Sequence, residues 1–274
     1  MISVSTIAAC CLTLFVSLIL PVLVLILFTL KHRKQGIVSA WLLGAAGFFV
    51  TQILIRLPIL TALQSQSWFL SFSQNHLFAY AFSLAFTAGL FELAGRFAVA
   101  QLMQNRLTLR RSLAAGLGHG SIEAILLIGI TYINNLVYIA MINSGAFDTV
   151  VAQTAAMGID VRQLELIRQQ LLSASPALFL LAGLERILAM TGHVAMSMLV
   201  CYGVAHRKTG ISTLLCLGIH TLIDLTAGIS LVLPQSVAYP VIYAILIVMA
   251  VISLFVIREL TRRWKKEVSH DSEE

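Results

Sequence analysis

Seven long apolar stretches divide the sequence, and they constrain the fold more than any other feature. Each is about 20 residues or longer, and at about 1.5 Å per helical residue this is enough to cross about 30 Å of membrane hydrocarbon. Inside hydrocarbon every backbone N–H and C=O must bond within the protein, so we expect an all-α, polytopic membrane helix bundle. The seven predicted transmembrane helices cover approximately residues 5–30, 38–63, 77–101, 112–142, 176–203, 211–233 and 237–258.

The composition agrees with a lipid environment. Hydrophobic residues make up 59% of the 274 residues and charged residues only 11%, whereas a soluble domain has about 25% charged residues. A soluble core of this length could not bury so much apolar side chain, so we expect a single membrane domain over residues 1–274. The four cysteines lie in apolar stretches without a C-x-x-C spacing, which is typical of packing residues.

The basic residues predict the orientation of the helices. They cluster after the first, third and fifth stretches and in the tail 259–274, whereas the opposite side has only Arg162 and Arg168. Because Lys and Arg mark the cytoplasmic side, we expect the N-terminus outside and the C-terminus in the cytoplasm. The net charge of +6 is therefore a topology signal, and no nucleic-acid partner is expected. The clustered residues are Lys31, Arg33, Lys34, Arg106, Arg110, Arg111, Arg207, Lys208, Arg258, Arg262, Arg263, Lys265 and Lys266.

One loop on the predicted outer side, residues 144–175, is long. Within it, Val161, Leu164, Ile167 and Leu171 recur near helical spacing with charges between them. This pattern favours an amphipathic helix on the outer membrane surface. A gate over a substrate entry is the alternative.

Ionisable residues inside the predicted spans are the strongest functional signal. Such a group at mid-membrane costs at least about 2.5 kcal/mol unless it is paired or reaches water. Three pairs are spaced four apart, which places each pair on one helix face. Polar faces on separate helices must then face one another, because lipid does not solvate them. The pairs are Glu92 with Arg96, His119 with Glu123, and His220 with Asp224.

The predicted depth in the membrane also indicates that these polar residues lie near one another. Counted from the predicted cytoplasmic ends, Glu92, His119, His193 and His220 lie within roughly 5 Å of one another along the membrane normal, at about 1.5 Å per residue. Arg56, beside Pro58, is different: it lies near the outer end of the second span, where we expect its side chain to extend to the interface.

One glutamate with three histidines in a membrane pocket fits hydrolysis. A carboxylate can take a proton from water. Imidazoles can hold a divalent metal ion or donate hydrogen bonds to an oxyanion. Asp224 could orient His220, and Glu123 could either brace its own helix or be a further ligand.

These motifs resemble the YhfC family of bacterial intramembrane metalloproteases, which is grouped with the type II CAAX-prenyl proteases, the PrsW proteases and the APH-1 subunit of gamma-secretase. The resemblance covers roughly residues 77–230. It is carried by F-E-x-x-x-R at 91–96, G-H-G-x-x-E at 118–123, a lone histidine at 193 and H-x-x-x-D at 220–224.

The resemblance implies roles for individual residues. It implies Glu92 as the catalytic carboxylate, Arg96 as its partner, and His119 and His220 as catalytic histidines. Asp224 takes the position of an Asn or Asp. Two departures matter: CAAX-type enzymes have a second glutamate where this chain has Phe91, and G-H-G-x-x-E replaces their F-x-x-x-H. Prenylated substrates are therefore not implied.

Residues and resemblance together predict an intramembrane protease that cleaves a membrane protein or peptide near the cytoplasmic half of the bilayer. Zn²⁺ is the expected cofactor, and a metal-free glutamate mechanism stays open. The expected ligands are His119, Glu123, His193 and His220. The alternatives are a non-catalytic APH-1-like scaffold and a proton- or metal-coupled transporter.

Overall fold

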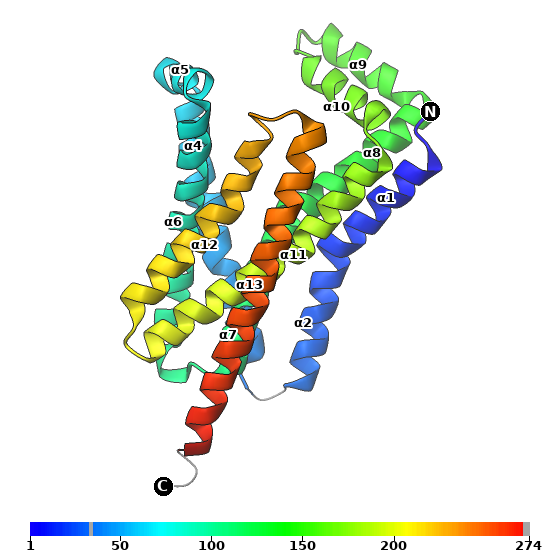
Figure 1. The fold of residues 1–274 in the computed structure, drawn as a ribbon. Coiled ribbons are helices and arrows are strands. Elements are labelled where there is room, and N and C mark those ends of the chain that lie inside the picture. The colour runs from blue at the N-terminus through cyan, green and yellow to red at the C-terminus, as the bar shows by residue number, and fades with distance from the viewer. Residues whose placement is uncertain (33–34, 271–274) are drawn as a thin grey trace. The chain divides into compact units, whose positions relative to one another are not determined.

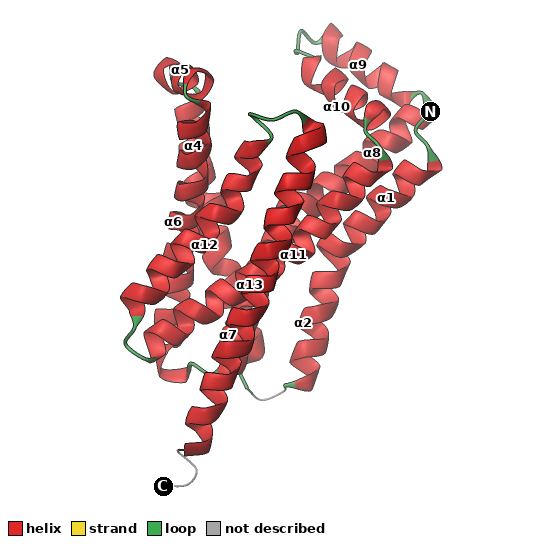
Figure 2. Cartoon of the chain, viewed as in Figure 1, coloured by secondary structure: helices red, strands yellow, loops and turns green. Residues whose placement is uncertain are grey.

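The computed structural model describes residues 1–32 and 35–270, and for residues 267–270 only the backbone. In this described part the chain consists of helices joined by loops and contains no strand (Figure 2). Seven of its helices are long and apolar enough to cross a membrane, which confirms the predicted number of spans. They are Val4–Lys31, Ile37–Gln64, Leu77–Arg106, Leu109–Ser144, Pro176–Ala205, Thr209–Ile229 and Gln235–Lys266.

The orientation of the spans stays a prediction. Arg33 and Lys34, which contribute to it, and residues 271–274 of the predicted basic tail lie outside the described residues.

The spans differ in regularity (Figure 1). Three contain a π-helical segment, at Phe15–Ile19, Phe49–Arg56 and Ala124–Gly129. These segments separate α1 (Val4–Leu14) from α2 (Leu20–Lys31), α3 (Ile37–Phe48) from α4 (Leu57–Gln64), and α7 (Leu109–Glu123) from α8 (Ile130–Ser144). The other spans are α6 (Leu77–Met103) with a 3₁₀ turn at Gln104–Arg106, α11 (Pro176–Ala205), α12 (Thr209–Ile229) and α13 (Gln235–His270).

The chain divides into two compact units. The first comprises Met1–Leu23 with Ala124–Ile187, and the second Val24–Glu123 with Leu188–Glu274. The single membrane domain expected over residues 1–274 stays a prediction. All of the predicted site residues belong to the second unit.

The first unit has a small apolar core in which α1 packs against α8. Cys10, fully buried, belongs to this core, as expected of a packing cysteine. The hydroxyl groups of Thr13 and Tyr132 both donate to the carbonyl oxygen of Phe179, at 2.6 and 3.2 Å. These bonds satisfy polar groups that would otherwise be costly in an apolar environment.

The long loop forms two helices rather than one. The expected amphipathic helix is present as α10 (Arg162–Ser173), and α9 (Ala146–Ala156), which the sequence analysis did not predict, precedes it. Gly158, with a φ of +74°, turns the chain between them. Asp160 then accepts the backbone N–H of Arg162 at 2.9 Å, and its hydrogen bond to the Arg162 side chain lowers the pKa of Asp160. The location of α10 on the outer membrane surface stays a prediction.

Helix pairs in the second unit approach closely at glycines. α3 packs along α7, and α6 packs along α12. A Cβ at Gly118 would overlap the backbone carbonyl of Trp41, and a Cβ at Gly44 would overlap that of Ala115. Small residues at membrane helix interfaces allow this approach. The glycines around His119 therefore serve helix packing.

Candidate functional site

Glu92 lies at the centre of a buried polar cluster in the second unit. Its Oε2 atom is 3.0 Å from Nη2 of Arg96, 3.0 Å from Nε2 of His119 and 2.7 Å from Nε2 of His220. These side chains come from α6, α7 and α12, and each is at most 4% exposed. The polar faces predicted from the spacing do face one another.

His193, on α11, joins the cluster through Arg96. Its Nδ1 is 2.6 Å from Nη2 of Arg96 and 3.7 Å from Oε2 of Glu92. Its other ring nitrogen, Nε2, is 2.7 Å from a carboxylate oxygen of Glu123. Because a guanidinium only donates hydrogen bonds, Nδ1 accepts from Arg96, and the ring proton is on Nε2 towards Glu123.

His220 has a carboxylate on both sides of its ring. Besides the contact of Nε2 with Glu92, its Nδ1 is 3.3 Å from Oδ2 of Asp224, one turn along α12. Asp224 is the more accessible of the two carboxylates, with a side chain 33% exposed. The predicted orienting contact from Asp224 to His220 is thus present in the structure.

The rings of the cluster pack on one another and on glycines. His119 stacks on His193 with ring centroids 5.4 Å apart, and Phe48 meets the His119 ring edge-on at 5.3 Å. A Cβ at Gly120 would lie 3.1 Å from the Cβ of His193. A larger residue at position 120 would therefore push α11 and its histidine away.

Arg56 has hydrogen-bond partners that the sequence analysis did not predict. Its Nη2 atom donates to the carbonyl oxygen of Leu84 at 2.7 Å, and its Nη1 atom is 3.3 Å from Oε1 of Gln52. The side chain is half-buried. The acceptors nearby on α6 are not revealed by the sequence. Extension of Arg56 to the membrane interface stays a prediction.

Gln52 is the site residue that sequence analysis missed. It is 5% exposed, and its Nε2 lies 2.7 Å from Oε1 of Glu92. A signal was present: Gln52 and Arg56 are four apart in an apolar span, the same spacing as the three pairs that we did identify.

The cluster could hold a metal ion. One ligand atom each from Glu92, His119 and His193 lies within 4.8 Å of the others. Two of these residues are predicted metal ligands, and Glu92 is the predicted catalytic carboxylate. The donor set fits zinc, which binds imidazole nitrogen and carboxylate oxygen. A metal-ligating histidine usually gives its other N–H to a carboxylate, and Glu123 and Asp224 face the outward nitrogens of His193 and His220 in this way.

A small cavity borders the cluster at Arg96 and His119. About 10 Å³ of it is open to the centre of a water molecule, roughly the space that one water needs. Ser197 also lines it. Among the described residues, Nε and Nη1 of Arg96 and Oγ of Ser197 have no hydrogen-bond partner. Buried water commonly satisfies such polar groups.

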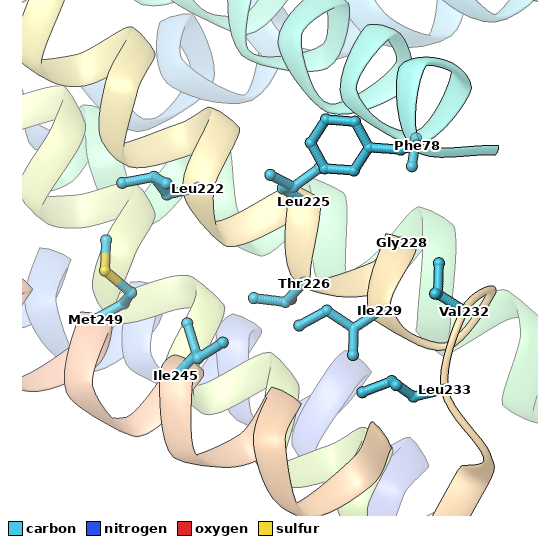
Figure 3. A pocket seen from close by; sticks show the side chains of 11 residues that line it. Phe78, Leu222, Leu225, Thr226, Gly228, Ile229, Val232, Leu233, Ile245 and Met249 are labelled. Carbon is cyan, nitrogen blue, oxygen red and sulfur yellow. The ribbon is translucent and has the colours of Figure 1, made fainter. Parts of the chain in front are cut away.

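A larger apolar pocket of about 500 Å³ lies between α6, α12 and α13 (Figure 3). Leu222, Leu225 and Ile229 of α12 line it together with Phe78 of α6 and Met249 of α13. His220 and Leu222 are two apart on α12 and so lie on roughly opposite helix faces. The pocket and the polar cluster are therefore on different sides of α12.

Comparison with known proteins identifies the family. Residues 16–255 match the model of the YhfC intramembrane metalloprotease family. The chain belongs to this family. It is 30% identical over 195 residues to the uncharacterized membrane protein YhfC of Bacillus subtilis (strain 168), covering 70% of this chain and 73% of that protein. No solved structure matches the chain.

Membership extends the resemblance beyond the four motifs. The YhfC match includes most of the seven spans, and the Glu92 cluster lies within it. This YhfC-family chain is thus a membrane protein with a buried Glu–His cluster that could hold a metal ion.

Proposed function

We propose that this YhfC-family protein hydrolyses a peptide bond of a membrane-associated substrate at Glu92, in the cytoplasmic half of a bacterial plasma membrane. The observation that carries the proposal is the convergence of Arg96, His119 and His220 on one carboxylate oxygen, buried in a membrane span. A carboxylate there is costly, and a general base with adjacent oxyanion donors is the chemistry that this arrangement supports.

Glu92 acts as the general base in this proposal. It takes one proton from a water molecule while the water oxygen bonds to the peptide carbonyl carbon. When the C–N bond breaks, Glu92 returns that proton to the leaving nitrogen, and the products are a carboxylic acid and an amine. Arg96, 3.0 Å away, keeps Glu92 ionised and oriented. The cavity beside Arg96 and Ser197 has room for one such water molecule.

The histidines act on the peptide carbonyl, whereas Glu92 acts on the water. N–H groups of His119 and His220 point at the same place and can donate to the oxyanion that forms from the peptide carbonyl. In the metal-dependent alternative, His119 and His220 would instead bind zinc together with His193, and a ring nitrogen that binds zinc would donate no hydrogen bond. Glu123 and Asp224 would orient two of these rings. A bound zinc ion would polarise the carbonyl and lower the pKa of water. The contact with His193 supports a role for Glu123 in orienting that ring rather than as a ligand.

Cleavage in proteoliposomes tests the proposal. The full-length protein would be incubated with a panel of internally quenched peptides that each contain one apolar membrane span, and the products identified by mass spectrometry. We expect the wild-type protein to cleave a subset of the panel, and Glu92→Gln and His220→Ala to be inactive. Glu92→Gln keeps the volume of the side chain, so the buried site is disturbed less than by truncation.

A control variant separates chemistry from folding. Ser253→Ala removes a buried hydroxyl on α13 whose bond goes to its own helix, at Met249 O, and should cleave like the wild type. Equal cleavage by wild type and Glu92→Gln would overturn the catalytic assignment. Zinc accumulation inside the proteoliposomes, without cleavage, would instead support a transporter.

A further inference from the structure

The second span contributes a polar pair that the proposed mechanism does not use. Gln52 and Arg56 lie in the π-helical segment Phe49–Arg56, between α3 and α4. π-Helical segments inside α-helices are frequent at functional sites, because the wider turn changes where side chains point. Here the segment aims both polar side chains at α6, the helix that carries Glu92.

The orientation of the Gln52 amide follows from its partners. Nε2 lies 2.7 Å from Oε1 of Glu92 and 3.3 Å from the carbonyl oxygen of Ala88, and both of these only accept. On the other side, Oε1 of Gln52 lies 3.3 Å from Nη1 of Arg56, which only donates. A flipped amide would put donor against donor and acceptor against acceptor. Gln52 therefore donates both of its N–H groups to α6.

Arg56 holds this amide in place. Its Nη2 donates to the carbonyl oxygen of Leu84 at 2.7 Å, and both Nε and Nη2 are 3.4 Å from Oγ1 of Thr87. Leu84, Thr87 and Ala88 lie in the two turns of α6 that precede Glu92. Gln52 and Arg56 together thus form a clamp along α6 that ends on the Glu92 carboxylate.

The two oxygens of Glu92 consequently have different partners. Oε1 is held by Gln52, while Oε2 faces Arg96, His119 and His220. A carboxylate held on one oxygen cannot rotate about its last bond without breaking that contact. The clamp therefore determines which oxygen faces the histidines.

We propose that Gln52, held by Arg56, is a positioning residue that fixes the rotation of the Glu92 carboxylate and so directs Oε2 at the reacting water. This rests on the proposed function. A base displaced by about 1 Å can lose 10²-fold in rate, so loss of Gln52 should slow the chemical step and leave substrate binding unchanged.

Two substitutions isolate the amide donor. Gln52→Met keeps the length of the side chain and removes both polar atoms. Gln52→Glu keeps the volume and the acceptor towards Arg56, but loses the donors to Glu92 and Ala88. Thr51→Val is the matched control, because this neighbouring residue bonds only to its own helix at Gly47 O in the contacts that the structure shows.

Kinetics on the cleaved peptide of the panel give the first readout. We expect kcat to fall by roughly 10- to 100-fold in both Gln52 variants, with KM within about twofold of wild type, and no change in Thr51→Val. A mere packing role would leave Gln52→Met, which keeps the length of the side chain and adds no charge, close to wild type. Wild-type kcat in Gln52→Met, alongside inactive Glu92→Gln, would overturn the inference and leave the proposed function standing.

Infrared spectroscopy gives a second readout that needs no activity. In protein carrying ¹³C-carboxyl glutamate, the difference between wild type and Glu92→Gln isolates the carboxylate stretching bands of Glu92. We expect the separation of the antisymmetric and symmetric bands to change in Gln52→Met, because Oε1 loses its hydrogen bond. The separation should be unchanged in Thr51→Val. Unchanged bands in Gln52→Met would refute the positioning role even if no peptide of the panel were cleaved.

Discussion

At the scale of single residues, His220 contacts a different carboxylate with each of its two ring nitrogens. One ring nitrogen is 2.7 Å from Glu92 and the other is 3.3 Å from Asp224. An imidazole between two carboxylates holds either a proton on both nitrogens or a metal ion on one of them. In both states Asp224, 3.3 Å from the outward nitrogen, is placed to orient the ring.

The zinc content of purified protein tests these contacts. We expect about one zinc per chain in the wild type and its loss in His119→Ala and His193→Ala, because each removes a proposed ligand. Asp224→Asn should keep the stoichiometry and weaken zinc affinity by about 10- to 100-fold, as other substitutions of orienting groups do. Metal analysis and competition with a chelator measure both quantities. Active, zinc-free wild-type protein would favour the metal-free glutamate mechanism.

Spacing and depth in the sequence identified the ionisable members of this cluster, but not their partners on other helices. Glu92 with Arg96 and His220 with Asp224 are neighbours on one helix, so their contacts follow from helical geometry. The contact of His193 with Glu123 joins two helices, and the sequence had offered Glu123 only as a ligand or a brace of its own helix. Contacts between helices depend on how each helix is rotated about its axis, which spacing alone leaves undetermined.

At the scale of helices, the second unit depends on glycines that bring pairs of helices together. α3 and α7 meet at Gly44 and Gly118, where neither position has room for a Cβ. His119 follows Gly118 directly, so this approach also sets the distance between α7 and the Glu92 cluster.

Substitution of Gly118 should therefore destabilise the protein. We expect Gly118→Ala to cost about 1–3 kcal/mol, because the added methyl group forces the α3 backbone at Trp41 to move. Thermal unfolding in detergent measures the effect as a lower melting temperature. Gly218→Ala is the control, since a Cβ there meets no atom of the described residues within 4 Å. Equal melting temperatures of the two variants would contradict the close approach.

The sequence predicted most helices but not their irregularities. The apolar stretches match the observed spans to within a few residues at most ends, and α10 matches the pattern Leu164, Ile167 and Leu171. The three π-helical segments and α9 were not predicted. A π-helical segment adds one residue within a continuous apolar helix and leaves no mark in its hydrophobicity.

At the scale of the whole molecule, the prediction that most needs an experiment is orientation. Basic residues recur on one side of all seven spans in the sequence, and Lys and Arg mark the cytoplasmic side. In the proposed mechanism, this orientation determines from which side substrate and water reach Glu92.

Fusions to the C-terminus test the orientation. We expect a C-terminal green fluorescent protein to fluoresce in bacterial cells and a C-terminal alkaline phosphatase to be inactive, because the former folds in the cytoplasm and the latter in the periplasm. The same pair of fusions placed in the loop 144–175 should give the opposite result. Phosphatase activity at the C-terminus would reverse the predicted topology and move the site to the outer half of the membrane.

The sequence by itself determined that the chain is an all-α membrane protein, how many spans it has, and which charged residues lie inside them. The reason is that hydrocarbon penalises every unpaired polar group. Long apolar runs therefore indicate spans, and the few charges within them indicate groups that are paired or functional. Only the tertiary structure decided that Glu92 is the common partner of three histidines, and that Gln52, itself held by Arg56, reaches the Glu92 carboxylate. Those contacts depend on the packing of helices at glycines and on a π-helical segment, and neither is encoded by residue spacing along one helix.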